Sequence, residues 1–329
     1  MSRLRLLRTL AILAILGGGL LVLYVSVGEY PLPPREVLQA VLGRGSERDQ
    51  FVIYTLRLPR GLVALLVGGA MATAGAMLQG LLRNPLASPD TVGAAGGANL
   101  AAVGVMLLAP AAPPAAQAVA AFAGALAAMG LVQRLAGPRS AAPARLLLVG
   151  VGITALAQAA VGFLLLLSPI YYVSEAMIWL SGSVYGRNAE QLRPLVASLV
   201  LLGPAAWLLS RHLDALQLGE DVARGLGVAV ERQRSRILLV AAALTGVAVA
   251  SAGAVGFVGL IAPHAARRLV GNRHAGLLPT AAAGGGLTVL VADLLGRTLA
   301  APAEIPCGVL TAAVGAPYFV YLLLKVRTV

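Results

Sequence analysis

The chain has 329 residues, of which 59% are hydrophobic, and its formal net charge is +12. Because apolar residues and Gly together make up only about half of a soluble protein, this composition excludes a soluble globular protein and indicates an integral membrane protein. The positive charge does not indicate a nucleic-acid-binding protein, since the Arg residues are scattered between apolar runs. The single cysteine, Cys307, excludes an intrachain disulfide and a cysteine-based metal cluster.

About ten apolar segments are candidate membrane-spanning helices. The first, Thr9 to Gly28, is uncharged and longer than the apolar region of a signal peptide, which is about 7–15 residues. We therefore predict that it is an uncleaved first span. Several later segments are short or broken by Gly and Pro, so the count carries an error of about one. They lie near 61–82, 91–109, 115–133, 146–167, 191–210, 237–252, 254–270, 275–296 and 308–324.

The predicted fold is therefore all-α, a polytopic membrane protein with a single transmembrane domain over residues 1–329. Between the spans we expect a polar loop at 29–60 and an amphipathic piece, too short to cross a membrane, within 168–190. The sequence RNPLASPD at 83–90 predicts that one helix stops there and that the next begins after Pro89.

The distribution of Lys and Arg predicts the orientation. If the N-terminus is cytoplasmic, 17 of the 25 Lys and Arg residues fall in cytoplasmic segments and eight fall outside. Because cytoplasmic loops are enriched in these residues, both termini are expected on the cytoplasmic side.

A polar island at 211–236 holds nine charged residues and must lie in water. Within it, Leu213, Leu216, Leu218, Val222 and Leu226 recur at roughly helical spacing, and Glu220 and Asp221 are placed to open a short helix. The pattern predicts two short amphipathic helices whose apolar residues need a partner. A solvated loop between two spans is the alternative, and the pattern leaves it open.

Residues that would carry chemistry are scarce. The chain contains no G-x-x-x-x-G-K-[ST] motif, and its only lysine is Lys325, so it cannot bind a nucleotide through a P-loop. His212, His264 and His274 have no metal-ligand spacing, which favours structural roles. Asp293 is the clearly ionisable residue within the spans, and we predict a local pair with Arg297 four residues later.

Several motifs, in order along the chain, resemble one family of membrane proteins. They are RLPR (57–60), GAMLQGLLRNPLASPDTVG (75–93), RLLLVGVG (145–152), WLSGS (179–183), LGEDVARGLGV (218–228), GFVGLIAPHAARRLVG (256–271), LLPTAAAGGGLTVLVADLLGR (277–297) and EIPCGVLTAAVGAPYFVYLL (304–323). The chain thus resembles the permease subunits of binding-protein-dependent ABC importers for iron-siderophore, haem and cobalamin, over essentially its whole length.

This resemblance implies a cobalamin-permease-like subunit that acts as a dimer in the bacterial cytoplasmic membrane. The implied partners are a second permease copy or paralogue, two ATP-binding-cassette ATPases that hold ATP and Mg, and an external substrate-binding protein. No cofactor is implied for this chain, and it is not expected to be an enzyme. WLSGSVYGRN, from 179, is most similar to the ferric-siderophore branch, with haem or cobalamin next. An ion-coupled secondary transporter is the alternative, and it predicts coupling-ion sites in broken helices.

The resemblance also assigns roles to residues of this chain. ATPase coupling falls to the island, at Leu218, Gly219, Glu220, Asp221, Val222, Arg224, Leu226 and Gly227. Docking of the binding protein falls to Arg57, Arg60 and Arg297, with capping of helix ends as their alternative role. The cytoplasmic gate falls to Asn84, Pro85, Leu86, Pro143 and Ala144, although the last two depart from the small hydroxyl residues of some relatives.

Overall fold

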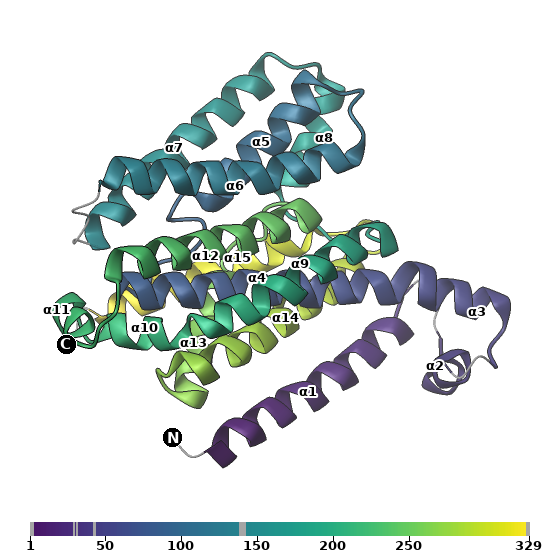
Figure 1. Cartoon of the computed structure of the whole chain (residues 1–329). Helices are drawn as coiled ribbons and strands as arrows, with labels where there is room; N and C mark the ends of the chain where they lie inside the picture. Colours follow the sequence, from purple (N-terminus) through teal and green to yellow (C-terminus); the bar gives the residue numbers. More distant parts are fainter. Residues whose placement is uncertain (1–2, 29, 31, 42–43, 138–142, 327–329) are drawn as a thin grey trace.

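The computed structural model of the chain describes residues 3–28, 30, 32–41, 44–137 and 143–326, and within these ranges the regular structure is helical (Figure 1). The elements are α1 (Arg3–Ser26), α2 (Pro34–Val41), α3 (Glu47–Phe51), the π-helical segment η1 (Val52–Arg57), α4 (Leu58–Leu82), α5 (Ala94–Leu108), α6 (Pro114–Ala136), α7 (Pro143–Leu166), α8 (Ile170–Leu180), α9 (Ala189–Leu208), α10 (Ser210–Gln217), α11 (Glu220–Gly225), α12 (Val230–Ala252), α13 (Val258–Val270), α14 (His274–Leu299) and α15 (Cys307–Val326).

Each of the ten predicted spans corresponds to one helix. Seven helical stretches of the described chain are long and apolar enough to cross a membrane, and α5 and most of α15 are shorter apolar helices. The tenth, α13, has only 13 residues. At about 1.5 Å per residue it rises about 20 Å, which is less than the roughly 30 Å hydrocarbon core of a bilayer. The all-α fold is thus confirmed, with one helix that begins part-way along the bundle.

Helix α4 lies at the centre of the bundle. It packs against α14, α12, α13 and α9, while α5, α6, α7 and α8 form a second group on one side, reached through contacts of α12 with α5 and α6 (Figure 1). Two glycines allow α4 and α14 to approach closely. A Cβ atom on Gly68 would collide with the carbonyl oxygen of Gly285, and a Cβ on Gly285 would collide with that of Gly68. Contacts between small residues are typical of helices packed in membranes.

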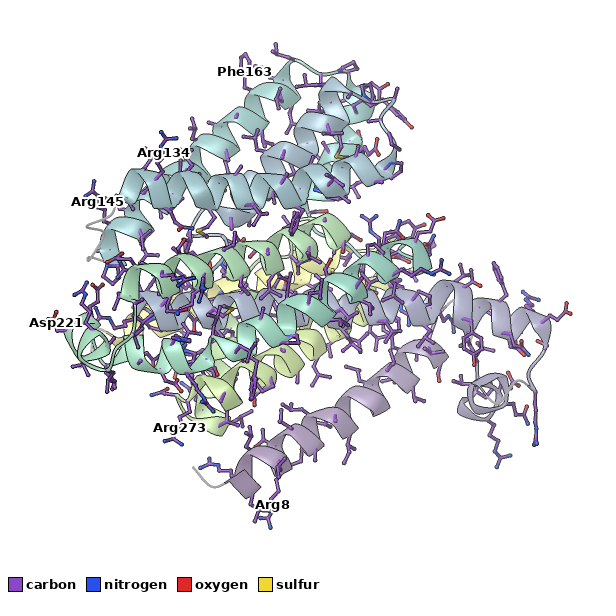
Figure 2. All side chains as sticks on the ribbon, in the orientation of Figure 1. Arg8, Arg134, Arg145, Phe163, Asp221 and Arg273 are labelled. Atoms are coloured by element: carbon purple, nitrogen blue, oxygen red, sulfur yellow. The ribbon has the colours of Figure 1, made fainter. Side chains whose placement is uncertain are left out.

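The bundle has two distinct ends. Helix α1 begins, α15 ends, and α10 and α11 lie at one end, which we call the terminal end; α2, α3 and α8 lie at the other, which we call the opposite end (Figure 1). Several charged residues gather at the terminal end, among them Arg8, Arg134, Arg145, Asp221 and Arg273 (Figure 2).

The structure corrects two boundaries. Residues 29–60 were expected to be a polar loop, but 47–57 are helical and continue into α4, so that the helix runs from Glu47 to Leu82. At the terminal end α4 stops as predicted before Asn84, where Arg83 takes a left-handed conformation with φ 49°. The next helix begins at Ala94 rather than directly after Pro89, because residues 84–93 form turns held by Ser88 and Thr91.

Candidate functional site

The polar island folds into two short helices with different surroundings. The apolar side chains of α10, Leu213 and Leu216, are buried in the core of the bundle. Helix α10 is also tied to α14, because Oδ1 of Asp214 accepts the backbone N–H of His274 at 2.9 Å and lies 2.7 Å from its ring Nδ1. The two predicted helices are confirmed. The apolar residues of α10 were expected to need a partner, and they pack against the rest of this chain.

Helix α11 and the residues that flank it instead present apolar side chains to the surroundings. Leu218 is 65% exposed, Val222 is 49% exposed and Leu226 is 64% exposed. Val222 lies within α11, Leu226 directly follows the helix, and Leu218 precedes it by two residues. Gly219 and Gly227 flank this segment with positive φ angles of 110° and 80°. A helix of six residues is too short to be stable alone in water, so this exposed apolar face, which we call the coupling face, is suited to a protein partner.

Ion pairs hold α11 in place. Glu220 accepts hydrogen bonds from Arg224 in the same helix, at 2.9 Å, and from Arg234 of α12. Asp221 pairs with Arg224 at 3.3 Å but is otherwise fully exposed. The predicted coupling residues therefore lie together, at the terminal end of the bundle.

At the opposite end, the predicted docking arginines lie near one another but are largely occupied within the chain. Arg57 is 7% exposed and donates to the carbonyl oxygens of Val25, at 2.6 Å, and Tyr30, at 2.5 Å. Arg297 donates to the carbonyl oxygen of Tyr24, with its guanidinium carbon 4.0 Å from the centre of the Tyr24 ring. Both arginines therefore cap carbonyl oxygens in the last turn of α1 or just beyond it. This is the helix-capping role that was the alternative to docking.

The third arginine, Arg60, joins two carboxylates. Its Nε and Nη2 donate to Asp293 at 2.9 and 2.8 Å, and its Nη1 and Nη2 donate to Glu304 at 3.1 and 2.7 Å. Asp293 also accepts the hydroxyl of Tyr24. The predicted local pair of Asp293 with Arg297 is wrong: the ion-pair partner of Asp293 comes from α4, 233 residues away in the sequence.

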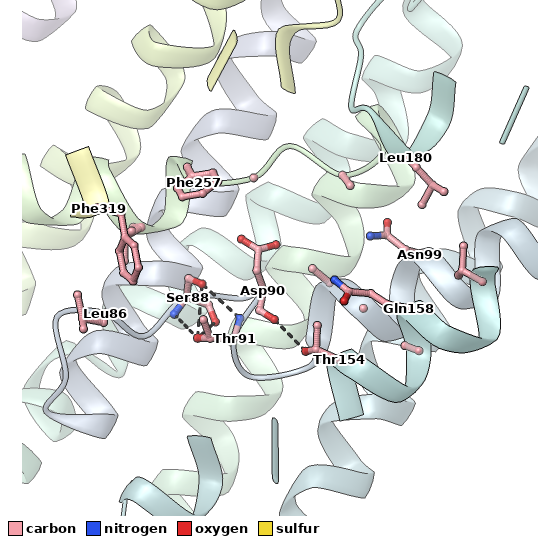
Figure 3. A pocket seen from close by; sticks show the side chains of 17 residues that line it. Leu86, Ser88, Asp90, Thr91, Asn99, Thr154, Gln158, Leu180, Phe257 and Phe319 are labelled. Atoms are coloured by element: carbon pink, nitrogen blue, oxygen red, sulfur yellow. Dashed lines mark hydrogen bonds between the residues drawn. The ribbon is translucent and has the colours of Figure 1, made fainter. Parts of the chain in front are cut away.

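A cavity of about 520 Å³ lies where α5, α7, α15 and the chain before α13 meet (Figure 3). Most of its lining is apolar, but Asp90, Asn99 and Gln158 bring polar side chains to it. The hydroxyl of Thr154 donates to the carbonyl oxygen of Asp90 at 2.9 Å, which joins α7 to the turn before α5. Phe257, the residue before α13, takes a left-handed conformation with φ 65°, and it lines the cavity together with Asp90.

The predicted gate residues lie at the terminal end of α4 and at the start of α7. Leu86 lines the cavity, and its backbone N–H donates to the side chain of Asn84 at 2.9 Å. Pro85 is exposed, and Pro143 and Ala144 form the first turn of α7. Only Leu86 of this set reaches the cavity lining, so the gate stays a prediction.

Sequence reasoning missed the polar lining of the cavity. Asp90 belongs to the RNPLASPD motif, which was recognised for its prolines, and an acid inside such a motif is the signal that could have identified it. Asn99 and Gln158 carry no comparable signal, because isolated amides in apolar helices show their common site only once α5 and α7 are packed.

Comparisons with known proteins agree with this architecture. The family model described as the FecCD transport family matches residues 12–325. The probable siderophore transport system permease protein YfhA of Bacillus subtilis is 44% identical over 95% of this chain and 93% of its own length. The Fe(3+)-citrate import system permease protein YfmE of the same organism is 42% identical over 95% of this chain and 93% of its own length. A solved metal-chelate type ABC transporter in an inward-facing conformation matches with a TM-score of 0.87 at 31% identity, over 97% of this chain and 99% of that one.

Proposed function

Because this chain belongs to the FecCD transport family, we propose that it carries a ferric siderophore across the bacterial cytoplasmic membrane, powered by ATP hydrolysis in a separate subunit. The observation that carries the proposal is the coupling face of α11, where Leu218, Val222 and Leu226 are exposed in water at the end of a membrane bundle. A chain without a P-loop needs a partner that binds ATP, and this face is suited to one. ATP and Mg belong to that partner, and the chain itself carries no cofactor.

The partners follow from the family. Two permease subunits, identical or paralogous, lie side by side above two ATPases, and a substrate-binding protein delivers the chelate at the opposite end. The terminal end faces the cytoplasm, because the labelled arginines of Figure 2, the start of α1, the end of α15 and the coupling face lie there. Arg60 is the best placed of the docking arginines, since its outward partner Glu304 is 31% exposed.

The transport step is a two-state rigid-body change. ATP binding closes the ATPases and displaces α11, and the two permease halves switch between outward-open and inward-open arrangements. The chelate passes the cavity beside Asp90 and leaves past the gate at Asn84, Pro85 and Leu86 of α4 and at Pro143 and Ala144 of α7.

Uptake by the reconstituted system tests this function. Proteoliposomes with this permease, its ATPase and the binding protein should accumulate a ferric siderophore only when ATP is enclosed. A panel of ferric citrate, haem and cobalamin tests the substrate, and the siderophore should be taken up fastest. Uptake by the permease alone under an ion gradient would instead identify a secondary transporter.

A further inference from the structure

Helix α11 is joined to α12 by a partly buried ring of two acids and two arginines. Glu220, the first residue of α11, has a side chain that is only 14% exposed, and Arg234, one turn into α12, is 9% exposed. Glu231 completes the ring, with its carboxylate 3.3 Å from Arg234 and 3.7 Å from Arg224. Glu220 is the member that accepts from an arginine of each helix.

Because Glu220 and Arg234 are nearly buried, their ion pair holds α11 firmly to α12. Exposed ion pairs contribute little to stability, whereas removing one partner of a buried pair leaves a charge without compensation. Leu218, Val222 and Leu226 of the coupling face are exposed, while Glu220 is nearly buried. A partner can therefore bind the exposed side chains while α12 holds Glu220.

Helix α12 leads from this ring to the cavity. Its 23 residues rise about 34 Å at 1.5 Å per residue, and they pack against α4, α6, α9 and α5. At its far end the carbonyl oxygen of Ala252 accepts the backbone N–H of Ser183 at 2.8 Å. The next residues, including Ala254, Gly256 and Phe257, line the cavity (Figure 3).

We propose that Glu220, acting through Arg234, is a positioning residue that locks the coupling helix to α12, so that a displacement of α11 reaches the cavity lining at 254–257. The inference rests on the proposed function, since the displacement comes from the ATPase. Non-helical backbone inside a membrane protein lines cavities or lies within protein, and this segment does so directly after α12. A tightly packed helix moves as a unit rather than deforming, which makes α12 suited to carry the displacement.

The test uses the complete complex of permease, ATPase and binding protein in lipid nanodiscs. Glu220→Gln and Arg234→Gln open the ring, and Arg234→Lys keeps its charge. The matched control for Arg234→Gln is Arg8→Gln, which removes the same charge from an exposed residue of α1 at the same end. In each background Ala254→Cys reports on the cavity through its rate of maleimide labelling, with and without ATP. Cys307, the other cysteine, is buried.

We expect Glu220→Gln and Arg234→Gln to keep the ATPase attached, since the coupling face is intact. Stimulation of hydrolysis by the binding protein should fall about 5-fold or more, and the ATP-dependent change in labelling at Ala254→Cys should disappear. Arg234→Lys should restore part of both responses, and Arg8→Gln should match the wild type.

Two results would overturn the proposal. If labelling still responds to ATP in both Glu220→Gln and Arg234→Gln, the displacement reaches the cavity by another route, such as α10 and α14. If Glu220→Gln releases the ATPase, Glu220 is a contact residue rather than a positioning residue. A wild-type permease that binds no ATPase would contradict the proposed function itself, which is a separate outcome.

Discussion

Arg60 and Asp293 form a two-point ion pair that joins the start of α4 to the end of α14, with donor–acceptor distances of 2.9 and 2.8 Å. Asp293 is only 2% exposed. A carboxylate buried in this way is tolerated because Arg60 and the hydroxyl of Tyr24 satisfy it. The pair therefore fixes where three helices, α1, α4 and α14, meet.

Replacing Asp293 by Asn should destabilise the protein, because an amide accepts fewer hydrogen bonds than a carboxylate and leaves a buried donor of Arg60 or Tyr24 without its acceptor. The expected loss is about 1–3 kcal/mol, typical of a buried donor left unsatisfied, since Glu304 still balances the charge of Arg60. Glu304→Gln is the control: Glu304 is 31% exposed, so its loss should cost about 1 kcal/mol or less. Thermal unfolding in detergent measures both, and equal melting temperatures for the two variants would contradict the role of Asp293.

The partner of Asp293 shows where sequence reasoning stops. Apolar runs located the ten helical segments, and the RNPLASPD motif located the end of α4. Periodicity, which relates a residue to neighbours three or four positions away, located the two short helices of the island. It paired Asp293 with Arg297 for the same reason. The actual partner, Arg60, depends on how α4 packs against α14, which no local pattern encodes.

The cavity and the predicted docking arginines at the opposite end also depend on tertiary packing that sequence patterns do not encode. Motif resemblance grouped Arg57, Arg60 and Arg297 correctly in space, but it could not tell that Arg57 and Arg297 donate to carbonyl oxygens near the end of α1. The cavity depends on residues of α5, α7 and α15 meeting the turn at Asp90. Such a site appears only with tertiary packing.

Gly285 is expected to tolerate no side chain. A Cβ there would collide with the carbonyl oxygen of Gly68 and the side chain of Ala72, whereas a Cβ at the neighbouring Gly284 would meet nothing within 4 Å. Gly285→Ala should therefore cost about 1–3 kcal/mol through overpacking. Gly284→Ala should be neutral or stabilising by about 0.5–1 kcal/mol, since Ala favours the helix. Melting temperatures of the two variants compare them directly, and the prediction fails if Gly285→Ala is as stable as Gly284→Ala.

Docking of the binding protein should depend on Arg60 and Glu304 in opposite directions. Arg60→Gln removes the charge that an acidic partner would meet, so docking should weaken, and more strongly at low salt. It also leaves Asp293 buried without its ion-pair partner, so its melting temperature should fall. Glu304→Gln frees the outward side of Arg60, so docking should strengthen. The control is Glu190→Gln, which changes an exposed acid in the first turn of α9 and should change affinity less.

Binding-protein affinity at several salt concentrations, measured in nanodiscs, checks these directions. Unchanged affinity in both the Arg60 and Glu304 variants at low ionic strength would show that docking uses another surface. Arg57→Gln should instead lower the melting temperature, because the carbonyl oxygens of Val25 and Tyr30 lose their buried donor.

The coupling face gives the sharpest test of the proposed function. Leu226→Asp or Leu218→Asp places a charge where an apolar contact with the ATPase is expected, at a cost of several kcal/mol if that contact excludes water. Both side chains are exposed, so the bundle should fold and insert normally. We expect the ATPase to be lost on purification, or its stimulation by the binding protein to be abolished.

The control is Leu269→Asp, which makes the same change at a 46% exposed leucine of α13, near the terminal end. It should keep both attachment and stimulation. If Leu269→Asp releases the ATPase and Leu226→Asp does not, the coupling surface lies at 264–274 and α11 is only a linker. The two variants are compared by copurification first and by stimulated hydrolysis second, because a weakened contact can survive purification and still fail to transmit the signal.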